Sequence, residues 1–279
     1  MTSCVICGCV KNCERYLDNV FKNIEKIQYL FEKSKIIISF DISDDFTLKK
    51  LVQLKSNYNM DIIINKEPLT NSRTLNIERA RNKIINKIYQ EYSDFTYFIM
   101  IDMDDVSSKP INIEVLQEAL AKQNMWDGLF FNNENYYDFW ALNFKDFQYS
   151  CWHSNDVKKL IHLMNNEFNK ECKKECKKEC KNVEFIECQS AFGGFGIYKI
   201  DKFKNCYYRS LIDLSLFDKQ AIQNIFNNHK ISYIINSQIY DCEHRYYHLN
   251  AIKNNNVRLR IYNKNLFPPY VGEHTKILE

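Results

Sequence analysis

Three carboxylates within four residues are the feature of this sequence best suited to chemistry. Asp102, Asp104 and Asp105 directly follow an apolar run at residues 98–101. Such a run is typical of a buried parallel strand, and open α/β sheets bind ligands just beyond the carboxyl ends of their strands. Acids this close repel one another unless a cation neutralises them, and hard oxygen ligands suit Mg²⁺ or Mn²⁺. The pattern predicts one edge of a metal–phosphate site, with a solvated acidic turn as the alternative.

Other charged side chains stand before and after these acids in the sequence. Arg79 and Arg81 precede them, and Asp241, Glu243 and His244 follow far downstream. A guanidinium matches phosphate geometry, so an arginine can neutralise charge on phosphate oxygens. Helical residues two positions apart point about 200° apart, so at most one of the arginines faces a shared site. A downstream carboxylate can act as a general base.

The chain has one glycine cluster, at residues 190–196. Glycine lets the backbone approach a ligand closely or adopt a positive φ. The cluster lacks the Lys-Ser/Thr pair of a phosphate-binding P-loop, which argues against a nucleotide loop of that kind. Glu187, just before the cluster, is a weaker candidate for the general base.

The composition is that of a soluble globular protein. Apolar residues make up 45% of the 279 residues and charged residues 26%, which are ordinary fractions. Only six glycines and four prolines leave little material for linkers, so we expect a single domain over residues 1–279. The formal net charge of +3 is too small to indicate a nucleic-acid partner.

The cysteines and the lack of long apolar stretches indicate an intracellular protein. Eleven cysteines are an odd number, and no secretory signal is recognisable, so a disulfide scaffold is not expected. Cys4-x-x-Cys7 lies in an apolar run without a second Cys-x-x-Cys pair, which favours buried core thiols over a zinc site. No segment reaches about 18 uncharged apolar residues, the length of a membrane span. We expect a cytoplasmic protein with no membrane span.

Strand-like and helix-like segments alternate in the N-terminal half, which predicts βαβ units and a largely parallel sheet. The strand-like segments are residues 4–10, 35–40, 60–64 and 95–101. The helix-like segments are residues 16–31, 48–54 and 77–92, with capping chemistry for the second at residues 43–45. The three acids then stand at the end of the fourth strand.

The second half is less regular. The sequence predicts a helix over residues 113–122 and strands over 128–132 and 231–235. Apolar and aromatic positions in residues 241–249 suggest another helix, with Glu243 at the junction between loop and helix. Backbone N–H groups at such a junction would stabilise the charged carboxylate.

A low-complexity segment occupies residues 169–181. Lys-Glu-Cys is repeated there at four-residue intervals, which would place Cys172, Cys176 and Cys180 on one helix face. We interpret the segment as a solvated surface insert, with a three-thiolate metal site as the alternative.

The order of these segments resembles that of nucleotide-sugar glycosyltransferases of the GT-A fold, family 2-like and closest to viral or capsule-type enzymes. The matching features are, in chain order, Lys11-Asn12 after the first strand, Asp41 after the second, Arg81-Asn82, Asp102-x-Asp104, residues 136–142, the glycine cluster and residues 241–245. The resemblance covers roughly residues 4–262. It implies an α/β fold of the GT-A (Rossmann-like) type, with a mixed, mainly parallel central sheet flanked by helices.

The resemblance implies a nucleotide-binding half over residues 1–106. In enzymes of this kind the acid after the second strand contacts the nucleobase, here Asp41. The Ala-Arg-Asn segment lies near the diphosphate or ribose, here Arg81 and Asn82. The first acid of the Asp-x-Asp pair binds the ribose, here Asp102. The implied donor is a UDP- or GDP-sugar.

The resemblance also implies Mn²⁺ or Mg²⁺ as cofactor, held by Asp102 and Asp104. A metal ion there would neutralise, as a Lewis acid, the charge that develops on the leaving diphosphate. His244 has two interpretations, a third metal ligand through its imidazole or the base itself.

The acceptor-binding half would span residues 107–279, and the acceptor would be a hydroxyl on a glycan or glycoprotein. Direct attack by that hydroxyl needs a general base. Glu243 is the first choice and Asp241 the second, since they match the acceptor-side acid motif only loosely. A viral enzyme of this class would act in the host cytoplasm.

Two other functions are compatible with the same acids. Asp102 and Asp104 also fit the opening motif of haloacid-dehalogenase-like phosphatases, in which the first Asp is a nucleophile. That motif normally follows the first strand, whereas about 95 residues with strand-like segments precede it here, and the chain contains no Gly-Asp dipeptide for the later metal motif. The other alternative is a non-catalytic nucleotide- or carbohydrate-binding module.

Overall fold

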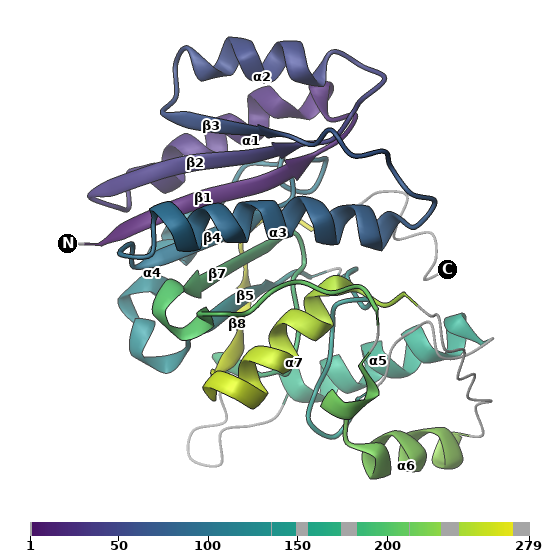
Figure 1. Cartoon of the computed structure of the whole chain (residues 1–279). Helices are drawn as coiled ribbons and strands as arrows, with labels where there is room; N and C mark the ends of the chain where they lie inside the picture. Colours follow the sequence, from purple (N-terminus) through teal and green to yellow (C-terminus); the bar gives the residue numbers. More distant parts are fainter. Residues whose placement is uncertain are drawn as a thin grey trace.

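A single eight-stranded sheet organises the part of the chain that the structure describes. The computed structural model describes residues 2–134, 136–148, 156–173, 183–211, 213–229 and 240–269. The strand order is β3-β2-β1-β4-β7-β5-β8-β6, and helices cover both faces of the sheet (Figure 1). The pairings β1–β2, β1–β4, β2–β3 and β5–β8 are parallel, and β4–β7, β5–β7 and β6–β8 are antiparallel. The predicted α/β class with a mixed, mainly parallel sheet is confirmed.

The N-terminal half consists of βαβ units. Its elements are β1 (Ser3–Val10), α1 (Glu14–Gln28), β2 (Lys33–Phe40), α2 (Thr47–Lys55), β3 (Met60–Ile64), α3 (Arg73–Glu91) and β4 (Tyr97–Ile101). Alternate residues of β1 enter different cores, Val5 and Cys7 on one face of the sheet and Cys4 and Ile6 on the other. This alternation explains why the strand is apolar throughout, because both of its faces are covered.

The C-terminal half extends the sheet beyond β4. Its elements are α4 (Ile113–Ala121), β5 (Gly128–Asn132), α5 (Val157–Cys172), β6 (Phe185–Glu187), β7 (Phe195–Lys199), α6 (Lys219–His229), α7 (Glu243–Asn255) and β8 (Leu259–Asn265), with short 3₁₀ helices at Gln123–Met125, Ile200–Phe203 and Leu214–Leu216. Helices α3, α5, α6 and α7 contribute to the core on one face of the sheet, and α1, α2 and α4 to the core on the other.

Most predicted elements agree with the structure to within a few residues. β3 and β5 have the predicted bounds, whereas α3 begins at Arg73, four residues before the predicted start at 77. Ser72 explains the earlier start, because its hydroxyl accepts a hydrogen bond from the N–H of Leu75 at 3.3 Å and caps the helix.

The interpretation of residues 169–181 as a solvated insert needs correction at its N-terminal end. Residues 169–172 form the last turn of α5, a helix that the sequence analysis did not predict. Cys172 packs against the core, and the side-chain amide of Asn132 lies 3.9 Å from its sulfur. Cys176, Cys180 and the strand predicted at 231–235 lie outside the described residues.

The described cysteines behave as core thiols. All are free, and Cys4, Cys7 and Cys13 are buried. Burial raises the pKa of Cys9 to about 12 and that of Cys13 to about 11, so these thiols stay protonated at neutral pH. No helix in the described part of the chain has the length and apolar character needed to cross a membrane.

Candidate active site

The carboxyl ends of three neighbouring parallel strands meet at one edge of the sheet, the place where open α/β folds bind ligands. Asp41 follows β2, Lys11 follows β1 and Asp102 follows β4. Because β1 lies between β2 and β4, Asp41 and Asp102 are two strands apart, about 10 Å at roughly 4.8 Å per strand. The structure therefore brings the two predicted donor-binding acids to the same edge.

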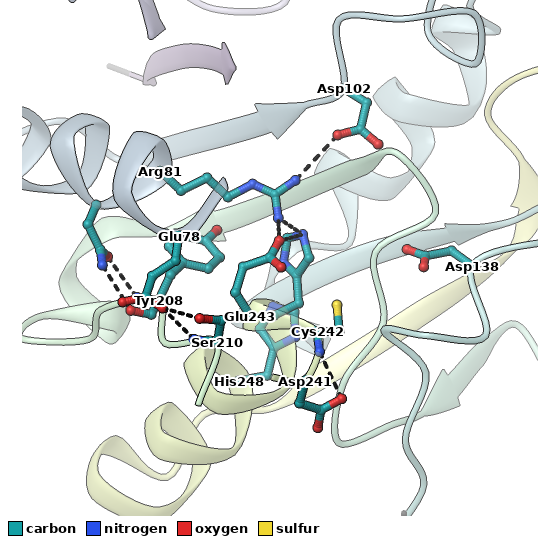
Figure 2. A network of polar contacts seen from close by, with 12 residues as sticks. Glu78, Arg81, Asp102, Asp138, Tyr208, Ser210, Asp241, Cys242, Glu243 and His248 are labelled. Atoms are coloured by element: carbon teal, nitrogen blue, oxygen red, sulfur yellow. Dashed lines mark hydrogen bonds and ion pairs between the residues drawn. The ribbon is translucent and has the colours of Figure 1, made fainter. Parts of the chain in front are cut away.

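The guanidinium of Arg81 joins two acids that are far apart in the sequence. Arg81 lies on α3, and its side chain is 7% exposed. Its Nη1 donates to Oε1 of Glu243 and contacts Nε2 of His244, and its Nη2 lies 3.3 Å from Oδ1 of Asp102 (Figure 2). One buried cation therefore connects the end of β4 with the start of α7.

Aromatic rings hold the same guanidinium in place. The guanidinium carbon of Arg81 lies 4.8 Å from the ring centre of Phe192 and 5.5 Å from that of Tyr208, within the range of cation–π attraction. Arg79, two residues earlier on the helix, is exposed. Of the two arginines Arg81 points into the cluster, in agreement with the prediction from helical periodicity that at most one would and with the family pattern at Arg81-Asn82.

Burial and Arg81 together set the protonation of the two α7 residues. Glu243 is the first residue of α7 and is 4% exposed. Burial raises the pKa of its carboxyl, and the charge of Arg81 lowers it. Burial and Arg81 both lower the pKa of His244 well below its ordinary value. His244 is therefore neutral and accepts from Arg81 through Nε2, which places its ring proton on Nδ1.

Asp104 is the acid of the site whose charge is least compensated. Its pKa is raised to about 7, first by burial and then by the negative charges of Asp102 and Asp105. The N–H of Val106 donates to its Oδ1 at 3.3 Å. A divalent cation would remove the repulsion, and carboxylate oxygens are ligands that Mg²⁺ and Mn²⁺ prefer. The acids after β4 therefore supply oxygen atoms of the chemical type that the predicted metal ion prefers.

The geometry gives His244 a role different from the third metal ligand that we predicted. Its Nε2 faces the Arg81 guanidinium, and the ring of Phe192 stacks on it with 3.9 Å between centroids. A metal ion on that nitrogen would have to displace a group of like charge. No group of three or more His, Cys, Asp or Glu side chains within the described ranges is arranged to hold a metal ion.

Two other side chains of α3 hold the backbone that leads to α7. Oε2 of Glu78 accepts from the N–H of Ser210 at 2.6 Å. Asn82, one helical turn on, accepts from the N–H of Tyr208 at 2.8 Å and donates to its carbonyl at 2.9 Å (Figure 2). The Ser210 carbonyl accepts from the N–H of Asp241 at 2.6 Å. The amide of Asn82 thus positions backbone, whereas we predicted that it contacts the donor.

Asp241, the second candidate base, is tied into the start of α7. It is 3% exposed, its Oδ1 accepts from the N–H of Cys242 at 2.8 Å, and the same oxygen lies 3.6 Å from Nε of Arg245. Nε of Arg245 also donates to the carbonyl of Trp140 at 2.7 Å. These contacts give Asp241 a structural role in joining α7 to residues 136–142.

The glycine cluster forms a left-handed turn beside Asp102. Gly193 and Gly194 have φ of +63° and +81°, a conformation that other residues rarely adopt. The Gly194 carbonyl accepts from the N–H of Asp102 at 2.9 Å, and the Gly193 N–H donates to Oδ2 of Asp138 at 3.0 Å. The positive φ predicted for this cluster is confirmed, and the turn links Asp102 to Asp138.

Asp138 is a site residue that the sequence analysis missed. It lies in residues 136–142, a segment that contributed to the family resemblance without any role for the acid itself. The available signal was a single carboxylate within an aromatic stretch, since such an acid needs a buried partner. That partner, the N–H of Gly193, is distant in the sequence, so the spacing of residues did not indicate it.

Glu187, the weaker candidate base, lies away from this edge. It is on β6, its side chain is 76% exposed, and its carboxylate is 3.8 Å from Nη1 of Arg260. Strands β7, β5 and β8 separate β6 from β4, about 19 Å at roughly 4.8 Å per strand.

His248, one helical turn after His244 on α7, makes two further buried polar contacts. Nδ1 of His248 is 2.9 Å from the Ser190 hydroxyl, and its Nε2 is 3.1 Å from the Tyr198 hydroxyl. Burial lowers the pKa of His248 to about 3. A neutral histidine with both nitrogens bonded supports α7 from within.

Comparison with solved structures finds proteins that share this architecture. The chain superposes on the crystal structure of S. aureus TarS 1-349 in complex with UDP with a TM-score of 0.51 and 14% identity, covering 100% of this chain and 64% of that one. For the complex of the same fragment with UDP-GlcNAc the TM-score is 0.50, the identity 14% and the coverage 99% and 61%. This chain thus spans about three-fifths of the TarS fragment.

A more distant match is the mannosyltransferase PcManGT from Pyrobaculum calidifontis in complex with GDP-Man and Mn²⁺, with a TM-score of 0.41, 8% identity and coverage of 74% of this chain and 47% of that one. No protein-family model matches the chain, and no curated protein matches it in sequence. These matches do not support the viral or capsule-type part of the resemblance. At this level of identity the likeness concerns the fold, and the fold of this chain is GT-A-like.

Proposed function

We propose that this protein is a metal-dependent glycosyltransferase that moves a sugar from a nucleoside-diphosphate sugar to a hydroxyl group. The observation that supports this most is the Arg81 cluster, in which Asp102 and Glu243 share one buried guanidinium at the edge of a GT-A-like sheet. TarS, which has the same type of fold, binds UDP and UDP-GlcNAc.

The nucleoside would lie across the ends of β2, β1 and β4. Asp41 at one side of this edge is oriented by Asn65, whose amide donates to Oδ1 of Asp41. Asp102 lies at the other side. In this proposal Asp41 accepts from the nucleobase and Asp102 from the ribose of a UDP- or GDP-sugar.

The diphosphate would lie near the start of α3. Arg73, the first residue of that helix, is exposed, and its positive charge lowers the pKa of both Asp104 and Glu243. The N-terminal end of a helix also favours negative charge. We assign Arg73 to the phosphates.

Asp104 and Asp102 would hold Mn²⁺ or Mg²⁺. When bound, the ion neutralises, as a Lewis acid, the charge that develops on the leaving diphosphate. Asp102 also accepts from Arg81 at 3.3 Å, so its carboxylate is oriented from the protein side before a ligand arrives. Orientation in advance lowers the cost of assembling the charged site.

The acceptor would be a glycan or glycoprotein hydroxyl and the transferred group a hexose. Glu243, our first choice for the base from sequence, is ion-paired with Arg81, so its carboxylate is already occupied by the guanidinium. We assign Glu243 to holding Arg81 in place. Its removal would leave Asp102 as the only acid of the cluster that pairs with Arg81.

A thermal-shift screen of UDP- and GDP-sugars with and without Mn²⁺ tests the proposal. A ligand that binds only the native state stabilises it by about 2.7 kcal/mol at 100 times its Kd. We expect one nucleotide sugar to raise Tm, to do so more strongly with Mn²⁺, and to release nucleoside diphosphate slowly. Asp102→Asn should reduce the rise in Tm and slow the release of nucleoside diphosphate.

The same screen, together with a phosphatase assay, distinguishes the proposed glycosyltransferase from a non-catalytic binding module and from a phosphatase. Binding of a nucleotide sugar with no release of nucleoside diphosphate, under any acceptor tried, would indicate a non-catalytic binding module. Hydrolysis of p-nitrophenyl phosphate that is lost in Asp102→Asn, with no response to nucleotide sugars, would indicate a phosphatase of the haloacid-dehalogenase type.

A further inference from the structure

Asp138 is a carboxylate of the site to which neither the donor nor the metal gives a role. Its Oδ2 is fixed by the Gly193 N–H at 3.0 Å, and the adjacent Gly194 carbonyl accepts from the N–H of Asp102 at 2.9 Å. A single glycine turn thus separates Asp138 from the acid at the end of β4. Figure 2 shows the Asp138 carboxylate turned toward the cluster formed by Arg81 and Glu243.

Asp138 differs from its neighbours in lying beyond ion-pairing distance of Arg81, although the charge of Arg81 still lowers its pKa. Asp102 and Glu243 both pair with Arg81, whereas Asp138 forms no salt bridge within the described ranges. Its carboxylate is nevertheless electrostatically part of the site, because its charge raises the pKa of Glu243 and the charge of Asp102 acts on it in turn.

The surroundings of Asp138 also make it more basic than an ordinary aspartate. Burial is the largest influence and raises its pKa, and the charge of Asp102 also raises it. The N–H groups of Gly193 and Ala141 and the charge of Arg81 lower the pKa, and the net change is an increase. A general base works best when its pKa lies near the working pH. The Gly193 N–H donates to Oδ2, and the backbone N–H of Ala141 also donates to the carboxylate, so two backbone donors orient this carboxylate before it accepts a proton.

We propose that Asp138 is the general base that accepts the proton of the acceptor hydroxyl, an inference that rests on the proposed sugar transfer. The hydroxyl oxygen forms a bond to the anomeric carbon of the donor sugar. The bond from that carbon to the diphosphate breaks, and its electron pair leaves with the nucleoside diphosphate. The hydroxyl proton passes to the carboxylate of Asp138 and then to solvent. The attack inverts the anomeric carbon.

This assignment divides the work between four acids. Asp102 and Asp104 face the donor, Glu243 holds Arg81, and Asp138 receives the proton. The glycine turn gives the division a structural basis, because Gly194 fixes the backbone of Asp102 while Gly193 fixes the carboxylate of Asp138.

Two substitutions test the proposal, with release of UDP from UDP-GlcNAc in Mn²⁺ as the readout, or release from whichever donor the screen selects. Asp138→Asn keeps an oxygen for the Gly193 N–H but cannot accept the proton, so we expect turnover to fall by about 10²–10⁴-fold with UDP binding unchanged. Asp146→Asn is the matched control, since this exposed aspartate lies only eight residues farther along.

Asp138→Ala with added azide supplies a readout that a purely structural role would not change. Azide attacks as an anion and releases no proton, so it needs no base. We expect the variant to form glycosyl azide from the donor at a rate near that of the wild type with azide, although it turns over hydroxyl acceptors poorly. If Asp138→Ala does not fold, Asp138→Asn with azide gives the same comparison.

Three outcomes would overturn the inference. Turnover by Asp138→Asn within about threefold of wild type would show that no proton passes to this residue. Weakened UDP binding in both Asp138→Asn and Asp138→Ala, or no glycosyl azide formed by Asp138→Ala, would show that Asp138 only shapes the glycine turn. A wild-type protein that binds no nucleotide sugar would remove the proposed function and this inference with it, a result distinct from the first two.

Discussion

The two ends of the central sheet carry acids in opposite electrostatic situations. Asp127 stands just before β5, and its carboxylate accepts three hydrogen bonds from Arg258 at 2.9, 3.0 and 3.1 Å and one from Lys199 at 3.4 Å. Lys199 pairs with Tyr97, the first residue of β4. Asp104 lies beyond the other end of β4, beside two more acids.

The pKa values of Asp127 and Asp104 differ in a way that indicates a structural role for Asp127 and a ligand-binding role for Asp104. Burial raises the pKa of Asp127, but the hydrogen bonds and charge of Arg258 outweigh it and bring the pKa to about 2. The pKa of Asp104 is instead raised to about 7. A compensated acid stabilises the native state, whereas the repulsion that Asp104 experiences from neighbouring acids costs stability, a pattern typical of functional sites.

Asp104→Asn should produce the largest effect. The substitution keeps the size of the side chain and removes the charge, so Mn²⁺-dependent release of nucleoside diphosphate should fall by about 10³-fold or more, roughly 4 kcal/mol of activation free energy. The metal-free variant should melt no lower than the wild type, because a repulsion has been removed. Retained Mn²⁺-dependent turnover would exclude Asp104 as a metal ligand.

Asp127→Asn should lower stability and leave turnover unchanged, the opposite of the result expected for Asp104→Asn. It leaves Arg258 and Lys199 without their acid, and hydrogen bonds to charged groups contribute about 1.5–3 kcal/mol each. We expect the free energy of unfolding to fall by about 2–3 kcal/mol in urea titrations, with the turnover of folded protein unchanged. A loss of turnover at temperatures well below Tm would contradict the separation of the two ends.

The pH dependence of stability should also distinguish Asp127 from Asp104. An unfolded aspartate has a pKa of about 3.9. The pKa of Asp127 in the native state is about 2, so the stability that it contributes is complete above pH 4 and is lost as pH falls toward 2. The pKa of Asp104 is about 7, so without metal the native state loses stability as pH rises from 4 to 7.

Melting curves between pH 3 and 8 measure both effects. Asp127→Asn should flatten the acid part of the profile and Asp104→Asn the part between pH 5 and 7. Mn²⁺ should raise Tm more at pH 7.5 than at pH 5.5, because the ion competes with a proton for Asp104. Equal shifts at the two pH values would place the metal elsewhere.

Local patterns predicted the sheet edge well, and long-range pairing explains what they did not predict. The apolar run before Asp102 placed β4. The helical spacing of Arg79 and Arg81 predicted that at most one of them is buried in the site, and the family pattern at Arg81-Asn82 selected Arg81. The partner of Arg81 in α7 and the bond from Gly193 to Asp138 join distant segments. No periodicity along the chain encodes such contacts.

Asn82 illustrates the same limit within one motif. Its place beside Arg81 matched the family pattern, yet Asn82 and Glu78 lie one turn apart on α3 and bind the backbone of residues 208–210. Which face of the helix meets that backbone depends on how α3 packs against α7. The sequence determined the helix, and tertiary packing determined the role of this side chain.

Arg73 and Arg79 give the smallest and most selective test of the donor side. Both are exposed residues of α3, so their helix propensity, charge and solvent exposure are matched. The charge of Arg73 acts on Asp104 and Glu243, whereas that of Arg79 acts on Glu67. A charge-assisted hydrogen bond to phosphate contributes roughly 1.5 kcal/mol or somewhat more. Arg73→Ala should therefore raise KM for the donor about tenfold, and Arg79→Ala should leave it unchanged. Because phosphate charge is the proposed ligand, binding of the free nucleoside should be equal in both variants. A matching loss of nucleoside affinity in Arg73→Ala would show that the start of α3 shapes the site without contacting the diphosphate.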